Sequence, residues 1–127
     1  MRIPEIPENV STIDNMHVAR RQKFALQDGS AHLYSWFYKQ VRNRGPWDYK
    51  QRSASYEAFG NFNYGATGTA AGIPASRLLR AAGMAQIAAG TSRPEFGSWW
   101  QDAPYGDDPN DQYWINQGIA YAQSKGF

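Results

Sequence analysis

One carboxylate, Glu57, lies in the part of the chain that is richest in groups able to bind or react. Around it, the segment 56–72 supplies amides, aromatic rings and closely spaced glycines, where ordinary packing would use Leu, Ile and Val. Amides hydrogen-bond, rings stack and glycines let other groups approach the backbone, which suits a groove for a polymer. The glycines also suit a slim helix face for close packing, so both interpretations stay open. The candidate substrate-binding residues of this segment are Asn61, Asn63 and Tyr64.

The elements that must position these residues are helical by periodicity nearly everywhere. We expect five helices, with approximate limits at Ser11 to Gln27, Ser30 to Gly45, Ser53 or Ser55 to Ile73, Pro74 to Gly90, and Asp108 onward. Their expected inward positions are Ile13, Met16, Phe24, Leu33, Trp36, Phe37, Val41, Leu78, Leu79, Ala82, Ala85, Ile115, Ile119 and Ala122. No alternating β-branched run is long enough to require a sheet. We therefore expect a mainly α fold, a compact single domain of about five helices with at most a small β element near residues 56–64.

Two segments are expected to lack helices. Residues 1–10 form an extended N-terminal segment, and residues 91–107 form a long aromatic loop. A loop of that length usually contributes to a binding surface or covers the core. After it, Asp108 is the predicted N-cap of the last helix, with Asp111 near the positive end of the helix dipole. The loop side chains that could stack on a substrate are Trp99, Trp100 and Tyr105.

Composition excludes several classes of protein. At 127 residues the chain has room for one domain with one modest core, and without cysteine it has no disulfide and no thiol catalysis. His17 and His32 are the only imidazoles, and neither stands in a metal-ligand spacing, so we expect no built-in metal and no cofactor. No run of roughly 18 apolar residues and no signal segment occurs, so we predict no membrane span.

Charge is distributed unevenly along the chain, although the net charge is only +2. Residues 1–52 hold nine Lys and Arg against five acids, and the remaining 75 residues hold four bases and six acids. Such an asymmetry can mark a phosphate-binding face, although basic residues dispersed on helices are more often a solvated surface. The basic half keeps a nucleic-acid hypothesis open.

Four ordered motifs resemble the polymorphic toxin type 44 (bacterial toxin 44) domain. They are Val41–Gln51, Tyr56–Gly68, Leu78–Gly83 and Gly106–Ile115, within a likeness that runs from about Ile6 to Tyr121. The resemblance implies the C-terminal toxin domain of a larger secreted effector, of the Rhs or type VI secretion kind, which kills competing bacteria that lack a cognate immunity protein. It implies delivery into target bacteria, and we expect a monomer. The chemistry stays open, because toxins of such systems include nucleases as well as cell-wall enzymes.

Glycoside cleavage in peptidoglycan is the leading chemical hypothesis. It requires one carboxyl group that an apolar wall keeps protonated near neutral pH, with a second polar group or carboxylate nearby. Glu57, flanked by Tyr56, Phe59 and Phe62, is the candidate acid. The motif order also resembles that of the lysozyme and lytic-transglycosylase superfamily, so a lysozyme-like arrangement is one expectation for the fold.

The two candidates for the second carboxylate lie outside the segment 56–72. Asp48 is the first choice and Asp107 the second, although an Asp in a Gly/Pro-bounded turn is commonly a cap. Trp47, which precedes Asp48, could stack on sugars together with the tryptophans of the loop.

Two alternatives remain. A metal-independent ribonuclease acting in the target cytoplasm would use Asp48 or Glu57 as a base, with Lys50 and either Arg52 or Arg80 on the phosphate, and would stack a base on Tyr49 or Trp47. No histidine lies in the motif-rich part of the chain, which weighs against it. A non-catalytic module would instead only bind glycan through the aromatic loop.

Overall fold

The computed structural model describes residues 1–127 and contains five α-helices, three short 3-10 turns and no strand. The helices are α1 (Thr12–Ala25), α2 (Ala31–Val41), α3 (Glu57–Ala70), α4 (Ala75–Ala88) and α5 (Pro109–Ser124). The 3-10 turns are Tyr49–Gln51, Ala54–Tyr56 and Pro94–Phe96. The mainly α prediction is confirmed, and the region considered for a β element forms a 3-10 turn that continues into α3. None of the helices has the length and apolar character of a membrane span.

Short polar side chains begin three of the helices, as the sequence predicts. Ser11 Oγ accepts from the amide of Asp14 at 3.1 Å, and Ser30 Oγ accepts from the amide of Leu33 at 3.0 Å. Asp108 accepts from the amide of Asn110 at 2.7 Å. Each bond satisfies a helix N–H that has no partner within the helix.

Glycines in the left-handed backbone region end three of the helices. Gly72, Gly90 and Gly126 follow α3, α4 and α5 with φ values of +83°, +74° and +83°. After α3, the amides of Gly72 and Ile73 return to the carbonyls of Thr69 and Gly68, and the same pair of bonds closes the other two helices. The last carbonyls of these helices are therefore used by their own chain.

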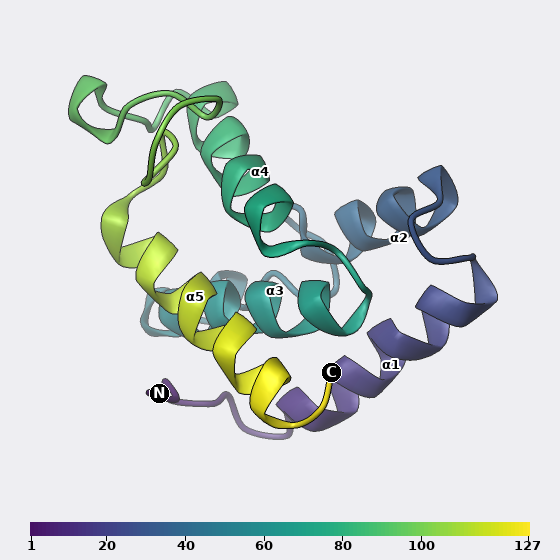
Figure 1. Ribbon diagram of the computed structural model, residues 1–127. Helices are drawn as coiled ribbons and strands as arrows, with labels where there is room; N and C mark the ends of the chain where they lie inside the picture. The colour runs from purple at the N-terminus through teal and green to yellow at the C-terminus, as the bar shows by residue number, and fades with distance from the viewer.

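The α3 and α5 helices form the centre of the molecule and run in the same direction. Figure 1 shows α5 crossing in front of α3, with α1, α2 and α4 around them. Two glycines bring the backbones together: a Cβ at Gly65 would lie 2.1 Å from the carbonyl oxygen of Ile115, and one at Gly118 would lie 2.0 Å from that of Phe62. Gly68 instead makes room for a side chain, since a Cβ there would lie 2.4 Å from Cδ2 of Leu78 on α4. The geometry thus favours the close-packing interpretation of these glycines.

The core surrounds this helix pair. Its largest fully buried hydrophobic side chains are Met16, Leu33, Phe59, Phe62, Leu78 and Ile115. Most of the predicted inward positions lie in it or against it, with two exceptions. Phe24 is 72% exposed, because it lies well around α1 from the buried Ala19. Ala85 is exposed as well, two residues beyond the buried Gly83 and therefore on the opposite side of α4.

The segments without helices are tied to the helical body. The backbone amide of Arg2 donates to Gln117 of α5 at 2.6 Å, and Arg52 Nη1 donates to the carbonyl of Glu8 at 3.5 Å, so residues 1–10 are tied to the body at two points. The loop between α4 and α5 includes the 3-10 turn Pro94–Phe96, and Ser92 Oγ donates to the carbonyl of Gly106 at 2.6 Å. That bond closes the base of the loop.

Candidate active site

Acidic side chains gather where α3 and α5 begin side by side. Glu57 is the first residue of α3, and Asp111 lies in the first turn of α5. Asn61, one turn into α3, joins them: its Nδ2 donates to Asp111 Oδ1 at 3.1 Å and to the carbonyl of Glu57 at 3.2 Å. Asp107 precedes α5 and its charge acts on both Asp111 and Tyr64. We call Glu57, Asp107 and Asp111 the acidic cluster.

Asp107 is the buried member of the acidic cluster, at 3% exposed. Its Oδ2 accepts from Gln112 Nε2 at 2.8 Å and its Oδ1 accepts from the amide of Asp108 at 2.9 Å. Burial raises the pKa of Asp107, and the charges of Asp108 and Glu57 add to the rise, while the two hydrogen bonds oppose it. A buried acid with defined partners thus forms the back of the site.

Asp111 has the property that acid catalysis needs. Desolvation by burial, followed by the charges of Asp107, Glu57 and Asp108, raises the pKa of Asp111 to about 7. Lys50 acts in the opposite direction. Although the positive end of the α5 dipole favours the ionised form, burial and crowding outweigh it. Asp111 therefore exchanges its proton near neutral pH.

Glu57 differs from Asp111 in its surroundings. The aromatic residues next to it in the sequence do not form a wall around it, because Phe59 and Phe62 are fully buried in the core and Glu57 is exposed. Glu57 is thus a solvated carboxylate at the start of a helix. The site therefore pairs a solvated carboxylate with a partly buried carboxyl that holds a proton, which is the division of roles in acid-assisted bond cleavage.

Several sequence-predicted site residues lie in the core instead of in a groove. Trp47 is 8% exposed and meets Trp36 edge-on at 5.8 Å, and Tyr49 meets Phe59 at 4.9 Å. Asn63 is buried, and its Oδ1 accepts from Asn15 Nδ2 at 3.0 Å. As they stand, these side chains support the fold.

Tyr64 and Asp48 are held by local hydrogen bonds. Tyr64 donates to the carbonyl of Leu78 at 2.6 Å, and burial, then the charge of Asp107, raises its pKa. Asp48 Oδ2 accepts from the amide of Arg44 at 2.7 Å and from Gln51 Nε2 at 3.0 Å, as a turn cap does. No contact joins Asp48 to the acidic cluster.

The structure thus brings together part of the predicted site and adds to it. Glu57 and Asn61 of α3 lie together with Asp107 and Lys50, so the site draws on three parts of the chain. Asp111 is a site residue that was not predicted from the sequence, because its place near the positive end of a helix dipole already explained it. The sequence does contain a signal that could have identified it: residues 107–111 include three acids, more than one helix cap needs.

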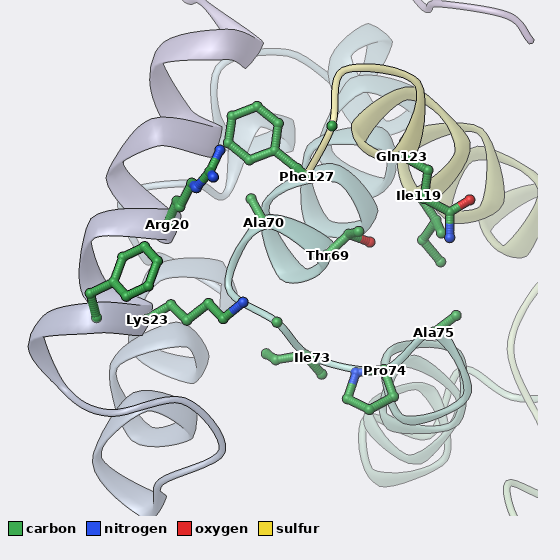
Figure 2. Close-up of a pocket in the computed structure, with 13 residues that line it drawn as sticks. Arg20, Lys23, Thr69, Ala70, Ile73, Pro74, Ala75, Ile119, Gln123 and Phe127 are labelled. Carbon is green, nitrogen blue, oxygen red and sulfur yellow. The ribbon is translucent and has the colours of Figure 1, made fainter.

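Two surface pockets lie away from Glu57 and Asp111. One, of about 360 Å³, lies between α1, the α3–α4 connection and the last turns of α5, and Arg20 and Lys23 line it (Figure 2). The other, of about 430 Å³, lies within the loop between α4 and α5. No group of three or more His, Cys, Asp or Glu side chains is arranged to hold a metal ion.

Comparison with known proteins gives one match. The model of the family described as Bacterial toxin 44 matches residues 39–124. No curated protein and no solved structure matches the chain. The matched range includes α3, α4 and α5 and every member of the acidic cluster. The lysozyme-like arrangement stays a prediction.

Proposed function

Because the chain belongs to the Bacterial toxin 44 family, we propose that it is an antibacterial toxin domain that cleaves glycosidic bonds in peptidoglycan. One observation carries this proposal: Asp111, with a pKa of about 7, stands beside the exposed carboxylate Glu57. A proton donor and a charged carboxylate on either side of a scissile bond are what glycoside hydrolysis requires.

Each group has a role in the proposed reaction. Asp111 donates its proton to the leaving glycosidic oxygen as the bond to the anomeric carbon breaks. Glu57 stabilises the positive charge that develops on the sugar, and water completes the hydrolysis and restores the proton. Glu57 was the candidate acid predicted from the sequence, whereas the burial of Asp111 favours Asp111 as the acid.

The surrounding residues tune this pair. Asp107, buried behind Asp111, keeps the Asp111 proton in place by like-charge repulsion, and Lys50 prevents the pKa from rising further. Asn61 fixes the position of the Asp111 carboxyl through its 3.1 Å hydrogen bond. The wall target places the activity in the periplasm of the recipient cell, where a cognate immunity protein would have to act.

Isolated peptidoglycan sacculi test the proposal. The purified domain and its Asp111→Asn and Glu57→Gln variants are incubated with sacculi, and soluble fragments are read by mass spectrometry. We expect disaccharide-peptides from the wild type and a loss of about 10² or more in rate from either variant. Glu5→Gln, which removes an exposed carboxylate elsewhere, is the matched control and should retain full activity. Wild-type rates in both cluster variants, with unchanged thermal transitions, would refute the assignment.

A ribonuclease is the second candidate, and one observation favours it. Lys50 lies close enough to Asp111 to lower its pKa, so a cation borders the acid–base group. Degraded total RNA with intact sacculi would select this function. Toxicity would then appear when the domain is expressed in the cytoplasm, whereas a wall hydrolase harms cells only after export. Unchanged toxicity of Glu57→Gln and Asp111→Asn would select the non-catalytic module.

A further inference from the structure

One side chain of α4, Arg80, contacts the loop between α4 and α5 at three residues. Its Nη1 donates to the carbonyls of Trp99 and Gln101, at 2.8 and 2.9 Å. Its guanidinium also lies 4.6 Å from the centre of the Tyr105 ring. Three points of the loop therefore rest on one residue of α4, which fixes the loop as a defined surface.

This fixed loop displays two tryptophans to solvent. Trp99 is 37% exposed and Trp100 is 61% exposed, and their rings meet edge-on at 5.6 Å. Burying such rings is normally favourable, whereas Arg80 bonds to the backbone on either side of Trp100 while both rings face solvent, an arrangement typical of a binding surface. Flat faces of exposed tryptophan suit the C–H faces of sugar rings.

A pocket with polar walls adjoins these tryptophans. It has a volume of about 430 Å³ and is formed by Glu95–Gly97 and Gln101–Pro104. The carboxylates of Glu95 and Asp102 and the amide of Gln101 can hydrogen-bond sugar hydroxyls, and Phe96 supplies an apolar wall. The same two carboxylates would repel a ligand that carries its own carboxylate.

The loop is connected to the acidic cluster through adjacent residues of α4. Gln112 Nε2 donates both to Asp107 Oδ2 and to the carbonyl of Leu79, at 2.8 and 3.1 Å. The next residue, Arg80, holds the carbonyl of Trp99. The acidic cluster and the loop are thus linked through Gln112 and two adjacent residues of α4.

We propose that the Trp99–Trp100 loop is a glycan subsite that takes a neutral N-acetylated sugar, and that Arg80 is the positioning residue that presents it. This inference rests on the proposed glycosidase function. It makes the substrate an extended strand, bound at the loop by a neutral sugar and cleaved at the acidic cluster. Acidic sugars are disfavoured at the loop because of Glu95 and Asp102.

Binding is measured apart from cleavage, in the Glu57→Gln/Asp111→Asn background, by tryptophan fluorescence with N,N′,N″-triacetylchitotriose as the probe. We expect saturable binding, a weakening of about tenfold for Trp100→Ala, and a weakening of severalfold for Arg80→Ala. Arg80→Lys should recover much of the binding, since one nitrogen makes both hydrogen bonds. Arg77→Ala, one turn earlier on α4 and bonded to Tyr34, is the matched control and should bind normally.

The outcomes separate this inference from the proposed function. Binding of chitotriose without any cleavage of sacculi by the wild type would leave the subsite standing and overturn the catalytic assignment. Cleavage of sacculi at an unchanged rate and KM in Trp100→Ala would overturn the subsite. Equal affinity for a glucuronic-acid-containing tetrasaccharide would overturn the preference for neutral sugars, and a loss in Arg77→Ala equal to that in Arg80→Ala would overturn the role of Arg80.

Discussion

The α3–α5 pair carries opposite charges at its two ends. Where the helices begin, Glu57, Asp107 and Asp111 gather, and where they end, Arg20 and Lys23 line a pocket whose wall contains no acidic side chain (Figure 2). Both arrangements follow the helix dipole, which favours anions at helix starts and cations at helix ends.

The two ends differ in whether their charges are balanced. At the finishing end, the last carbonyls are capped by the chain itself, and Arg20 rests 5.0 Å from the Phe127 ring. At the starting end, burial and like charges raise the pKa of Asp111 to about 7 in spite of two helix dipoles and Lys50. Charged groups that only complement a helix dipole stabilise the structure. Like charges that gather in spite of their mutual repulsion are instead typical of a reactive site. This contrast is why we assign the reaction to the starting end.

Separating α3 from α5 should disrupt both ends of the pair at once, and we expect the largest loss of stability from it. Gly118→Ala would place a Cβ 2.0 Å from the Phe62 carbonyl oxygen, and we expect a loss of about 3 kcal/mol in the free energy of unfolding. Urea denaturation measures it. Gly60→Ala is the control, since nothing lies within 4 Å of its Cβ and the helix should gain up to about 1 kcal/mol. Equal stabilities of the two variants would show that the helices do not depend on close contact.

Removing Asp111 should stabilise the protein above about pH 4, and most above pH 7. The folded-state pKa of Asp111 is raised from 3.8 to about 7, so its ionised form opposes folding. The penalty is absent below about pH 4, grows between the two pKa values and is complete above pH 7. The free energy of unfolding of Asp111→Asn should therefore exceed that of the wild type by about 2 kcal/mol at pH 8, after allowance for the partial exposure of Asp111. At pH 4 the two proteins should be equally stable. A pH-independent difference in urea denaturation would contradict this linkage.

A substitution where α3 and α5 end should lower the stability of the protein without changing the pKa of Asp111. Gly126 has φ +83° and free space around it, so Gly126→Ala should cost about 1 kcal/mol through backbone strain alone. Thermal denaturation measures the loss. The pKa of Asp111, read by carboxyl NMR, should stay at its wild-type value, and a shift would mean that the two ends are coupled.

The smallest effects should come from single charges next to Asp111. Lys50→Met should raise its pKa above the wild-type value, because Lys50 favours the ionised form, and Glu57→Gln should lower it by removing a like charge. Carboxyl NMR titration gives both directions. Shifts of the same sign would refute the arrangement of charges proposed for the site.

Local features of the fold were predictable from the sequence because their causes are local. Ser11, Ser30 and Asp108 cap helices with side chains that reach two or three residues along the chain. The two wrong inward positions, Phe24 and Ala85, lie on helices where small or polar residues blur the apolar stripe.

The site was less predictable because it depends on contacts between distant residues. Asn61 meets Asp111 across 50 positions, and that pairing follows from the glycine contact between α3 and α5, which no periodicity reveals. Trp and Tyr side chains often line binding grooves, but Trp47 and Tyr49 are buried in the core. A residue type predicts what a side chain can do, and only packing determines whether it is free to do so.

The glycines of α3 have a consequence for the order of folding. Gly60, Gly65 and Gly68 together weaken this 14-residue helix by about 2 to 3 kcal/mol relative to alanine, so α3 is a poor helix until α5 covers it. During translation, α5 leaves the ribosome after α1, α2, α3 and α4. The acidic cluster therefore cannot assemble on a nascent chain until α5 has been synthesised.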